Sequence, residues 1–565
     1  MNFDSLPDVL AHHAATLGDQ PVYQYVPPRS TATIPLGYRA LHDAACGIGA
    51  ALQAQGLRGR NALLLYPPGL EFIEAFFGCL RGSVSTIPMY IPPRNVPDAR
   101  LRAIAATVEI AAILTVKSRE ALAHSLAAEL LPGQTCRVIC TDDLPAADVA
   151  GATAADLPVD LDVPPLIQFT SGSTSRPKGV VVSHTNIMAN QRMIQRAFRH
   201  RGGETVVSWL PFFHDMGLIG NIMQPLYIGG SSILMSPTDF LQNPHKWLQL
   251  ISMHAADTSG APNFAYDYCV ARVTAEQADG LDLGSWAVAY NGSEMIRPTT
   301  MRRFCERFKE NGFRPDAVLH CYGMAETTLY VAGGRAYPDG TLPAGEARPD
   351  AIASVGRPDE ESEVLIVDEE GIEQPEGRTG EIWVRGPHVA QGYVNNPQAT
   401  EATFEARPGG CRFAPAYLRT GDLGYLRGGE LHIVGRVKNL IVVNGKNYHG
   451  EEIEYFVARS DAHFLESGAC IMQLNEGLSN NEIVFMQEIR KSAVEAAGAD
   501  LERLEDKALQ LSRQVLEQFN LPVHRFIYLR ESRLPRTSSG KVDRARARDF
   551  ALAETRPSLL EVQTR

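Results

Sequence analysis

The sequence predicts a protein of the α/β class, with helices packed on parallel sheets through its first 330 residues. Short apolar runs that suit buried strands alternate there with segments whose apolar residues recur at helical spacing. The predicted secondary structure becomes rich in β-strands after residue 354, and the sequence pattern changes again after residue 436. Such regions along 565 residues agree with the roughly three or four units that this length allows.

The α/β part contains three clear strand candidates. They are residues 61–66 (NALLLY), 111–116 (AAILTV) and 205–210 (TVVSWL). Residues 70–80 place apolar side chains at positions 70, 73, 76, 77 and 80, which predicts a helix directly after the first strand. Repetition of this order favours parallel sheets with helices on their faces.

The last two regions differ from the first. Short strands at 363–367, 380–384 and 430–434 are separated by Gly, Pro and Asp turns, which favours a small, distorted barrel. Residues 500–519 in the tail predict an amphipathic helix with one face toward a core. The apolar residues of that face are Leu504, Ala508, Leu511, Val515 and Phe519.

Composition excludes several classes of protein. With a formal charge of −12, the chain lacks the overall positive charge that is typical of a nucleic-acid binder. A content of 44% hydrophobic residues argues against disorder. None of the nine cysteines forms a CxxC pair, so we expect reduced thiols in the cytoplasm. The N-terminus has no basic start or apolar core, and residues 103–116 are too short to span a bilayer. We expect no signal peptide and no stable membrane insertion.

The sharpest motif is LIQFTSGSTSRPKGVVVSH at residues 166–184. An apolar strand runs into small hydroxyl residues and glycine, whose backbone N–H groups suit phosphate oxygens, and Lys178 adds a positive charge. The spacing differs from a Walker loop, because Pro177 precedes the lysine and Gly179 follows it. A flexible surface loop rich in Ser and Thr is the alternative interpretation.

This loop resembles the phosphate loop of the acyl-adenylate-forming (ANL) ligases, which include acyl-CoA synthetases, adenylation domains of peptide synthetases, and luciferases. Further stretches follow in the order that this superfamily requires. They are SWLPFFHDMGLIG (208–220), NGSE (291–294), YGMAE (322–326), YLRTGD (417–422), GRVK (435–438) and LPRTSSGK (534–541). SGAPNFAYDYC (259–269) and Ala325 resemble the fatty acyl-AMP ligases, which are related to long- and medium-chain acyl-CoA synthetases.

The resemblance implies a domain organisation. A large N-terminal domain (1–436) would hold two parallel-type α/β layers and the small β-barrel, at about 354–436. A mobile, small α+β C-terminal domain (437–565) would act as a lid, with its hinge near Lys438.

The resemblance also implies roles for individual residues. Lys541 would bridge the substrate carboxylate and the α-phosphate, His214 would lie near the acyl carboxylate, and Lys178 would be the third catalytic residue. Glu326 would hold Mg²⁺, because a hard cation prefers carboxylate oxygen. The residues implied in binding ATP or AMP are Thr170, Ser171, Gly172, Ser173, Thr174, Asn291, Gly292, Ser293, Glu294, Tyr322, Gly323, Met324, Ala325, Asp422 and Arg436.

The implied activity is ATP- and Mg²⁺-dependent conversion of a fatty acid to acyl-AMP, followed by transfer to the phosphopantetheine of an acyl carrier protein. Candidates for an acyl tunnel are Phe213, Met216, Ile222 and Phe264. Only 27 residues separate Glu326 from Ser354, fewer than such ligases usually insert there, so coenzyme A remains an alternative acceptor. A catalytically silent sensor and a P-loop phosphohydrolase are the alternatives from other classes.

Overall fold

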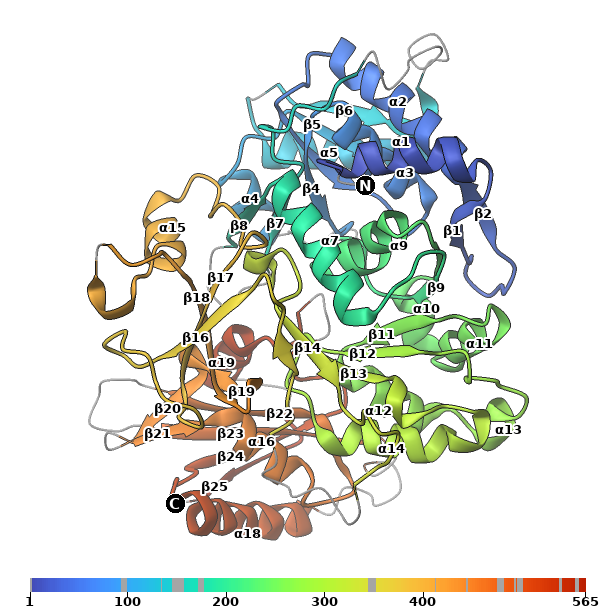
Figure 1. The fold of residues 1–565 in the computed structure, drawn as a ribbon. Coiled ribbons are helices and arrows are strands. Elements are labelled where there is room, and N and C mark those ends of the chain that lie inside the picture. Colours follow the sequence, from blue (N-terminus) through green and yellow to red (C-terminus); the bar gives the residue numbers. More distant parts are fainter. Residues whose placement is uncertain are drawn as a thin grey trace.

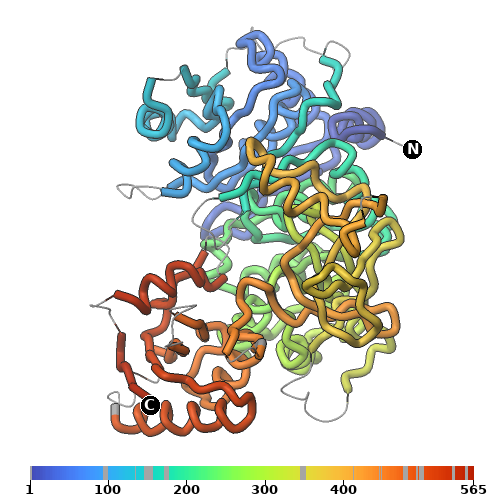
Figure 2. The backbone as a smooth tube through the Cα atoms, turned by 90° about the vertical axis from the view of Figure 1, so that its left-hand side faces the viewer, coloured from blue at the N-terminus to red at the C-terminus, as the bar shows by residue number. Residues whose placement is uncertain are grey.

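The computed structural model describes residues 3–92, 99–133, 135–144, 157–170, 177–343, 352–411, 413–443, 446–474, 482–491, 494, 501–537, 541–553 and 558–564. Two large sheets and their helices form the upper and middle parts of the molecule in Figure 1. The elements after residue 440 form a lobe beside them, drawn in orange to red in Figure 2. Within the described ranges, no helix is long and apolar enough to cross a membrane.

A nine-stranded sheet carries most of the site residues. Its strands run parallel from β13 to β1, and β2, β14 and β15 are antiparallel to their neighbours. In order across the sheet they are β15 (Arg357–Pro358), β14 (Ala332–Arg335), β13 (Val318–Tyr322), β12 (Val288–Asn291), β11 (Thr258–Ala261), β9 (Thr205–Ser208), β10 (Ser231–Leu234), β1 (Pro21–Tyr25) and β2 (Ile34–Gly37). The strand predicted at 205–210 is confirmed as β9.

A six-stranded sheet contains the two earlier predicted strands. Its members are β6 (Arg137–Cys140), β5 (Ala112–Thr115), β3 (Asn61–Leu65), β4 (Ser85–Met89), β7 (Leu166–Phe169) and β8 (Gly179–Val182). All neighbours are parallel except β7 and β8, which form a hairpin around residues 170–178. The strands predicted at 61–66 and 111–116 are thus confirmed as β3 and β5.

Helices pack on both sheets and join them through one apolar core. That core includes Leu64 and Val182 of the six-stranded sheet and Val207 and Ile233 of the nine-stranded sheet. The predicted helix at 70–80 is confirmed as α3. The helices of this part are α1 (Leu6–Leu17), α2 (Tyr38–Ala54), α3 (Leu70–Arg81), α4 (Ala99–Ala105), α5 (Glu120–Leu130), α7 (His184–Phe198), α8 (Asp215–Leu218), α9 (Gln224–Tyr227), α10 (Pro237–Gln242), α11 (His245–Met253), α12 (Asn263–Arg272), α13 (Ala275–Ala278) and α14 (Pro298–Phe308).

The β-rich segment forms a four-stranded antiparallel sheet in the order β16 (Glu363–Val367), β17 (Gly380–Arg385), β18 (Leu418–Arg427) and β19 (Glu430–Arg436), with α15 (Pro397–Phe404) between β17 and β18. In the described residues β16 and β19 do not pair, so the sheet is open where a closed barrel was expected. The reason lies in its apolar face. Ile366, Ile382 and Leu431 pack against Ile296 and Val331 from outside the segment, so closure is not needed to bury them.

The C-terminal part has its own sheet and cores. The order is β22 (Phe464–Leu474), β23 (Glu482–Ile489), β24 (Arg525–Arg530) and β25 (Leu560–Gln563), preceded by the hairpin of β20 (Leu440–Val443) and β21 (Lys446–His449). Its helices are α16 (Gly450–Ala458), α18 (Leu501–Phe519) and α19 (Arg544–Leu552). Ala508, Leu511 and Val515 are fully buried, which confirms the apolar face predicted for α18. Both apolar clusters here draw only on residues from 441 onward.

Candidate active site

The β7–β8 hairpin positions the predicted phosphate loop. Thr170 donates its backbone N–H to the carbonyl of Lys178 (3.1 Å), which closes the ends of the loop. Ser171, Gly172, Ser173 and Thr174 lie outside the described residues. The ammonium of Lys178 lies 4.5 Å from the centre of the Tyr393 ring. This cation–π contact holds the positive charge of Lys178 beside Tyr393.

Tyr393 connects this lysine to Glu326. Its hydroxyl donates to Oε1 of Glu326 at 2.8 Å, and the Glu326 side chain is buried. Burial raises the pKa of Glu326, while the Tyr393 hydrogen bond and the positive charge of Arg436 act in the opposite direction. A carboxylate has about four acceptor positions, so the tyrosine leaves room for another ligand.

The turn after β13 depends on a close backbone approach. Gly323, Met324 and Ala325 lead from Tyr322 into the short helix η6 (Ala325–Thr327), which carries Glu326. A Cβ at Gly323 would lie only 1.6 Å from the carbonyl oxygen of Leu329, so only glycine fits there. The YGMAE motif therefore places its tyrosine and its glutamate at the carboxyl end of a parallel strand, where α/β sheets bind ligands.

Asp422 joins Tyr322 to Arg436. The Tyr322 hydroxyl donates to Oδ2 of Asp422, and Nε of Arg436 lies 2.7 Å from Oδ1. Asp422 and Arg436 face each other across the β18–β19 pair, so strand register creates this contact. Burial, followed by the charge of Asp422, raises the pKa of Tyr322. Asp422 is only 3% exposed, and the arginine supplies the charge that this buried carboxylate needs.

Lys541 reaches this cluster from the C-terminal part. Burial lowers the pKa of its ammonium, as does the positive charge of Arg436, whereas Asp215, Glu294 and Asp422 raise it. Of these groups, Asp215 is the most distant from Lys541 in the sequence. The acidic residues that act on Lys541 thus belong to α8, to the segment after β12 and to β18.

His214 stands beside Asp215 in the turn before α8. Burial, Lys541 and Arg100 together lower the pKa of His214 to about 3, so the imidazole is neutral at ordinary pH. The turn is tight, because a Cβ at Gly217 would lie 2.1 Å from the carbonyl oxygen of Pro211. A π-helical turn, η3 (Ile219–Met223), follows α8, and such turns are frequent at functional sites.

The NGSE residues border the same region. The Asn291 amide donates to Asn263, and Glu294 accepts the backbone N–H of Phe264 at 2.6 Å. Ser293 has a φ of 72°, an unfavourable conformation for a residue with a side chain. Gly292 lies against Cys321, whose sulfur would be 2.7 Å from a Cβ at that position.

An apolar cavity opens beside these residues. The space inside it, together with the solvent at its open side, amounts to about 550 Å³. Met216 lines it, whereas Phe213, Ile222 and Phe264 are not among its lining residues. Ile222 is fully buried in the core. The lining residues are Ile194, Phe198, Asp215, Met216, Gly220, Tyr290, Ser293, Cys321, Tyr322, Gly323, Leu329 and Tyr330.

Sequence reasoning missed much of this lining. Ile194 and Phe198 belong to α7, and Tyr290 belongs to β12. Their apolar character is typical of core residues, so no local pattern marks them as cavity walls. Tyr330 follows the YGMAE motif by a few residues, and that proximity was the one available signal.

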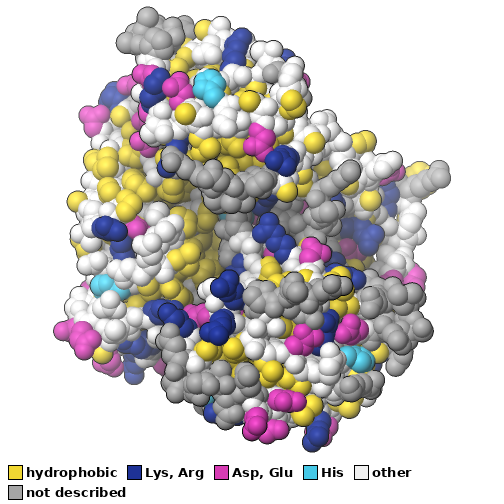
Figure 3. All heavy atoms as spheres, turned by 180° about the vertical axis from the view of Figure 1, so that it is seen from behind, with side chains coloured by type: hydrophobic (Ala, Val, Ile, Leu, Met, Phe, Trp, Pro, Cys, Tyr) yellow, Lys and Arg dark blue, Asp and Glu magenta, His cyan; other side chains and the backbone are white. Residues whose placement is uncertain are grey.

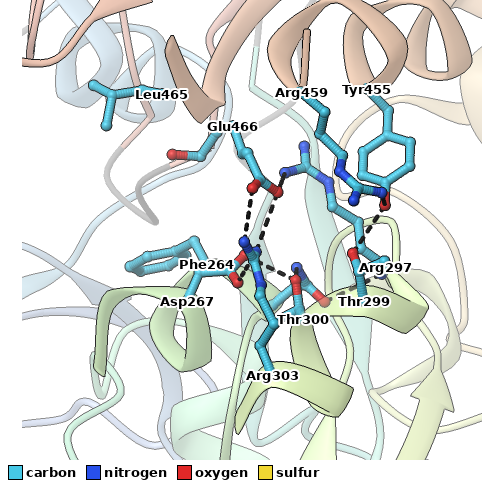
Figure 4. A network of polar contacts seen from close by, with 12 residues as sticks. Phe264, Asp267, Arg297, Thr299, Thr300, Arg303, Tyr455, Arg459, Leu465 and Glu466 are labelled. Atoms are coloured by element: carbon cyan, nitrogen blue, oxygen red, sulfur yellow. Dashed lines mark hydrogen bonds and ion pairs between the residues drawn. The ribbon is translucent and has the colours of Figure 1, made fainter. Parts of the chain in front are cut away.

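Polar contacts connect the C-terminal part to α12 and α14 (Figure 4). Arg303 lies between Asp267 (2.6 Å) and Glu466 of β22 (2.9 Å). Thr299 and Tyr455 share a hydrogen bond of 2.8 Å, and Arg297 lies over the Tyr455 ring. These contacts join the C-terminal part to α12 and α14 in the same domain arrangement in which Lys541 interacts with Asp215.

Lys438 lies in η8 (Val437–Asn439), a short turn between β19 and β20. It therefore occupies the connection between the sheet of β16–β19 and the C-terminal part.

The surface view in Figure 3 shows a hollow near the centre of this face. Hydrophobic side chains and Lys and Arg side chains lie around it.

The described ranges contain no group of three or more His, Cys, Asp or Glu side chains arranged to hold a metal ion. A magnesium ion at Glu326 would therefore need further ligands from substrate or water. Mg²⁺ commonly binds through one or two carboxylates together with phosphates and water.

Residues 10–394 match the model of the AMP-binding enzyme family, and the chain belongs to that family. It is similar to the medium-chain fatty acid–[acyl-carrier-protein] ligase JamA of Moorena producens, with 33% identity over 97% of this chain and 95% of the relative. It is 35% identical to the long-chain fatty acid–AMP ligase FadD26 of Mycobacterium marinum, over 90% of each protein. The crystal structure of a fatty acid AMP ligase from Legionella pneumophila aligns with a TM-score of 0.71 at 32% identity, covering 100% of this chain and 98% of that one.

Proposed function

We propose that this protein activates a fatty acid with ATP to give acyl-AMP and pyrophosphate, and then transfers the acyl group to the phosphopantetheine thiol of an acyl carrier protein. One observation carries the proposal: Lys541 of the C-terminal part interacts electrostatically with Arg436, Asp215, Glu294 and Asp422, and Asp215 also lines the apolar cavity. Lys541 and Arg436 thereby bring positive charge to the place where two anions must meet. The names of the relatives, a fatty acid–AMP ligase and a carrier-protein ligase, support it.

In the first step a carboxylate oxygen of the fatty acid attacks the α-phosphorus of ATP. The bond from that phosphorus to the oxygen bridging to the β-phosphate breaks, and pyrophosphate leaves. In our proposal Lys541 offsets the repulsion between the two anions and holds them in line. Lys178, Thr170 and the loop that follows Thr170 hold the departing phosphates. Neutral His214 lies beside the acyl carboxylate without adding charge.

The nucleotide would bind across β13 and β18. Tyr322 would stack on adenine, and residues 291–294 would line the adenine side. Asp422 would accept the ribose hydroxyls, for which it retains acceptor positions beside the Tyr322 and Arg436 contacts.

Glu326 fits the role of a magnesium ligand. Its carboxylate is a hard oxygen donor that is only partly occupied by Tyr393, and it lies close to Lys178 through that tyrosine. A bound Mg²⁺ would neutralise phosphate charge.

The second step requires access for a thiol. In our proposal residues 437–565 turn relative to residues 1–436 about a hinge near Lys438, which withdraws Lys541. The thiol sulfur attacks the acyl carbonyl carbon, the bond from that carbon to the adenylate oxygen breaks, and AMP leaves. Coenzyme A is a second candidate acceptor, because the segment between Glu326 and Ser354 is short.

The test measures both steps. Fatty-acid-dependent exchange of labelled pyrophosphate into ATP is expected, and no exchange with any fatty acid would refute activation. Holo carrier protein and coenzyme A are then offered in parallel to preformed acyl-AMP. Faster transfer to the carrier protein is expected, and faster transfer to coenzyme A would favour the second acceptor.

We also place the protein in the cytoplasm, where ATP is available and thiols are reduced. All nine cysteines are free in the structure, as a reducing compartment requires.

A further inference from the structure

Three aromatic rings that pack on one another, called the closure below, form part of the wall of the apolar cavity. Phe198 stacks on Tyr290 with ring centres 5.4 Å apart and meets Tyr330 edge-on at 6.4 Å. Asp215, Ser293, Tyr322 and Gly323 also line this cavity, and they belong to the nucleotide site described above. An acyl chain that starts at the adenylate and enters this cavity would therefore meet these rings.

The backbone and side chains of this closure are held in place. The Tyr290 hydroxyl donates to Oδ1 of Asn221 at 2.8 Å, and the Asn221 amide donates to the carbonyl of Met216 at 2.7 Å. Asn190 bonds both the N–H and the carbonyl of Tyr330. Buried groups with satisfied hydrogen bonds resist displacement, so the closure does not yield easily to a longer ligand.

Phe198 also contacts a buried polar group. His200 meets the Phe198 ring edge-on at 5.4 Å, and its Nε2 lies 3.0 Å from Oγ1 of Thr258. Its Nδ1 lies 3.4 Å from the amide nitrogen of Gln224, and all three polar residues are buried. An acyl chain forced past the rings would break these hydrogen bonds without replacing them, which offsets the free energy gained by burying a few methylenes.

We propose that Phe198, Tyr290 and Tyr330 set an upper limit on acyl chain length, so that the enzyme accepts medium-chain acids and rejects long-chain acids. This inference rests on the function proposed above. It identifies the three rings as specificity-determining residues that contact the far end of the substrate. The cavity is lined mainly by apolar side chains, among them Ile194, Met216 and Leu329, which suits an alkyl chain.

Two substitutions test the limit in opposite directions. Phe198→Ala removes one ring of the closure and lengthens the cavity. Gly220→Ala adds a methyl group to its side wall, where the nearest atom to a new Cβ is Cδ2 of Leu329 at 3.4 Å, so the backbone need not shift. Phe519→Ala is the matched control, because it removes a phenyl ring from a part-buried position on α18 in the C-terminal part.

The readout is kcat/KM for pyrophosphate exchange with octanoate, laurate and stearate. Each methylene that gains a buried position improves recognition about fourfold, equivalent to about 0.8 kcal/mol. The wild type should prefer octanoate or laurate to stearate. Phe198→Ala should raise the stearate-to-laurate ratio at least about tenfold, Gly220→Ala should lower the laurate-to-octanoate ratio, and Phe519→Ala should change neither.

Equal use of stearate and laurate by the wild type would overturn the inference. So would a stearate-to-laurate ratio that is unchanged in a folded Phe198→Ala variant. If Phe198→Ala fails to fold, the Gly220→Ala ratio decides, and no change in that ratio counts against the proposal. Absence of exchange with every acid would instead contradict the proposed function, so the two failures are distinguishable.

Discussion

The contacts around Glu466 predict how the two half-reactions can be separated. Glu466 faces Arg303 at 2.9 Å and Arg297 at 4.0 Å across the interface of Figure 4. The substitution Glu466→Gln keeps the shape of the side chain and removes its charge. Asp267 continues to hold Arg303, so the N-terminal side of the interface stays in place.

The size of the expected free-energy change in Glu466→Gln follows from the partial burial of the Glu466–Arg303 ion pair. The Glu466 side chain is 17% exposed and Arg303 is 41% exposed, which places the pair between surface ion pairs and fully buried ones. We therefore expect the arrangement with Lys541 near Asp215 to lose about 1–2 kcal/mol relative to other domain arrangements. This free energy corresponds to a factor of about 5–30 in the domain equilibrium.

The assay compares the two steps in one preparation. Pyrophosphate exchange should fall by up to about 30-fold in Glu466→Gln. Transfer from preformed acyl-AMP to holo carrier protein should stay the same or rise, because it does not need Lys541 in place. Glu531→Gln is the matched control, since Glu531 pairs with Arg272, which is 55% exposed, and it should change exchange by less than about threefold.

Two results would refute this reasoning. One is an equal loss of both half-reactions in Glu466→Gln, which would indicate general damage to the fold. The other is an equal loss of exchange in Glu466→Gln and Glu531→Gln, which would mean that burial of the pair does not matter.

Three further predictions concern the site itself. Lys541→Ala should slow acyl-AMP formation by about 10²–10³-fold and affect transfer from added acyl-AMP much less; equal loss of both rates would contradict its role. Tyr393→Phe removes the hydrogen bond to Glu326 and should raise the Mg²⁺ concentration needed for half-maximal exchange, and an unchanged requirement would argue against Glu326 as the ligand. The pKa of His214 falls from 6.5 to about 3 on folding, so between these values the unfolded chain binds more protons and the free energy of unfolding decreases as pH falls. His214→Gln should therefore remove about 2 kcal/mol of acid destabilisation at pH 5, measured by urea unfolding at pH 7 and pH 5, and an equal loss in both proteins would be inconsistent with this pKa.

Local patterns determined many elements of this protein. Strands β3, β5 and β9 were predictable because burial of both faces requires a short continuous apolar run. Helix α3 was predictable because its apolar residues recur at helical spacing. The face of α18 was predictable for the same reason. The order of the motifs from Thr170 to Lys541 indicated the family before any contact was known.

Only the tertiary structure decided how distant segments meet. The contacts of Asp422 with Tyr322 and Arg436 depend on strand register and on two different sheets. The open form of the β16–β19 sheet depends on side chains outside that segment, and the cavity closure combines α7, β12 and a turn after η6. A residue such as Phe198 carries the same local signal whether it fills a core or ends a cavity, because packing partners far away in sequence determine which space remains empty.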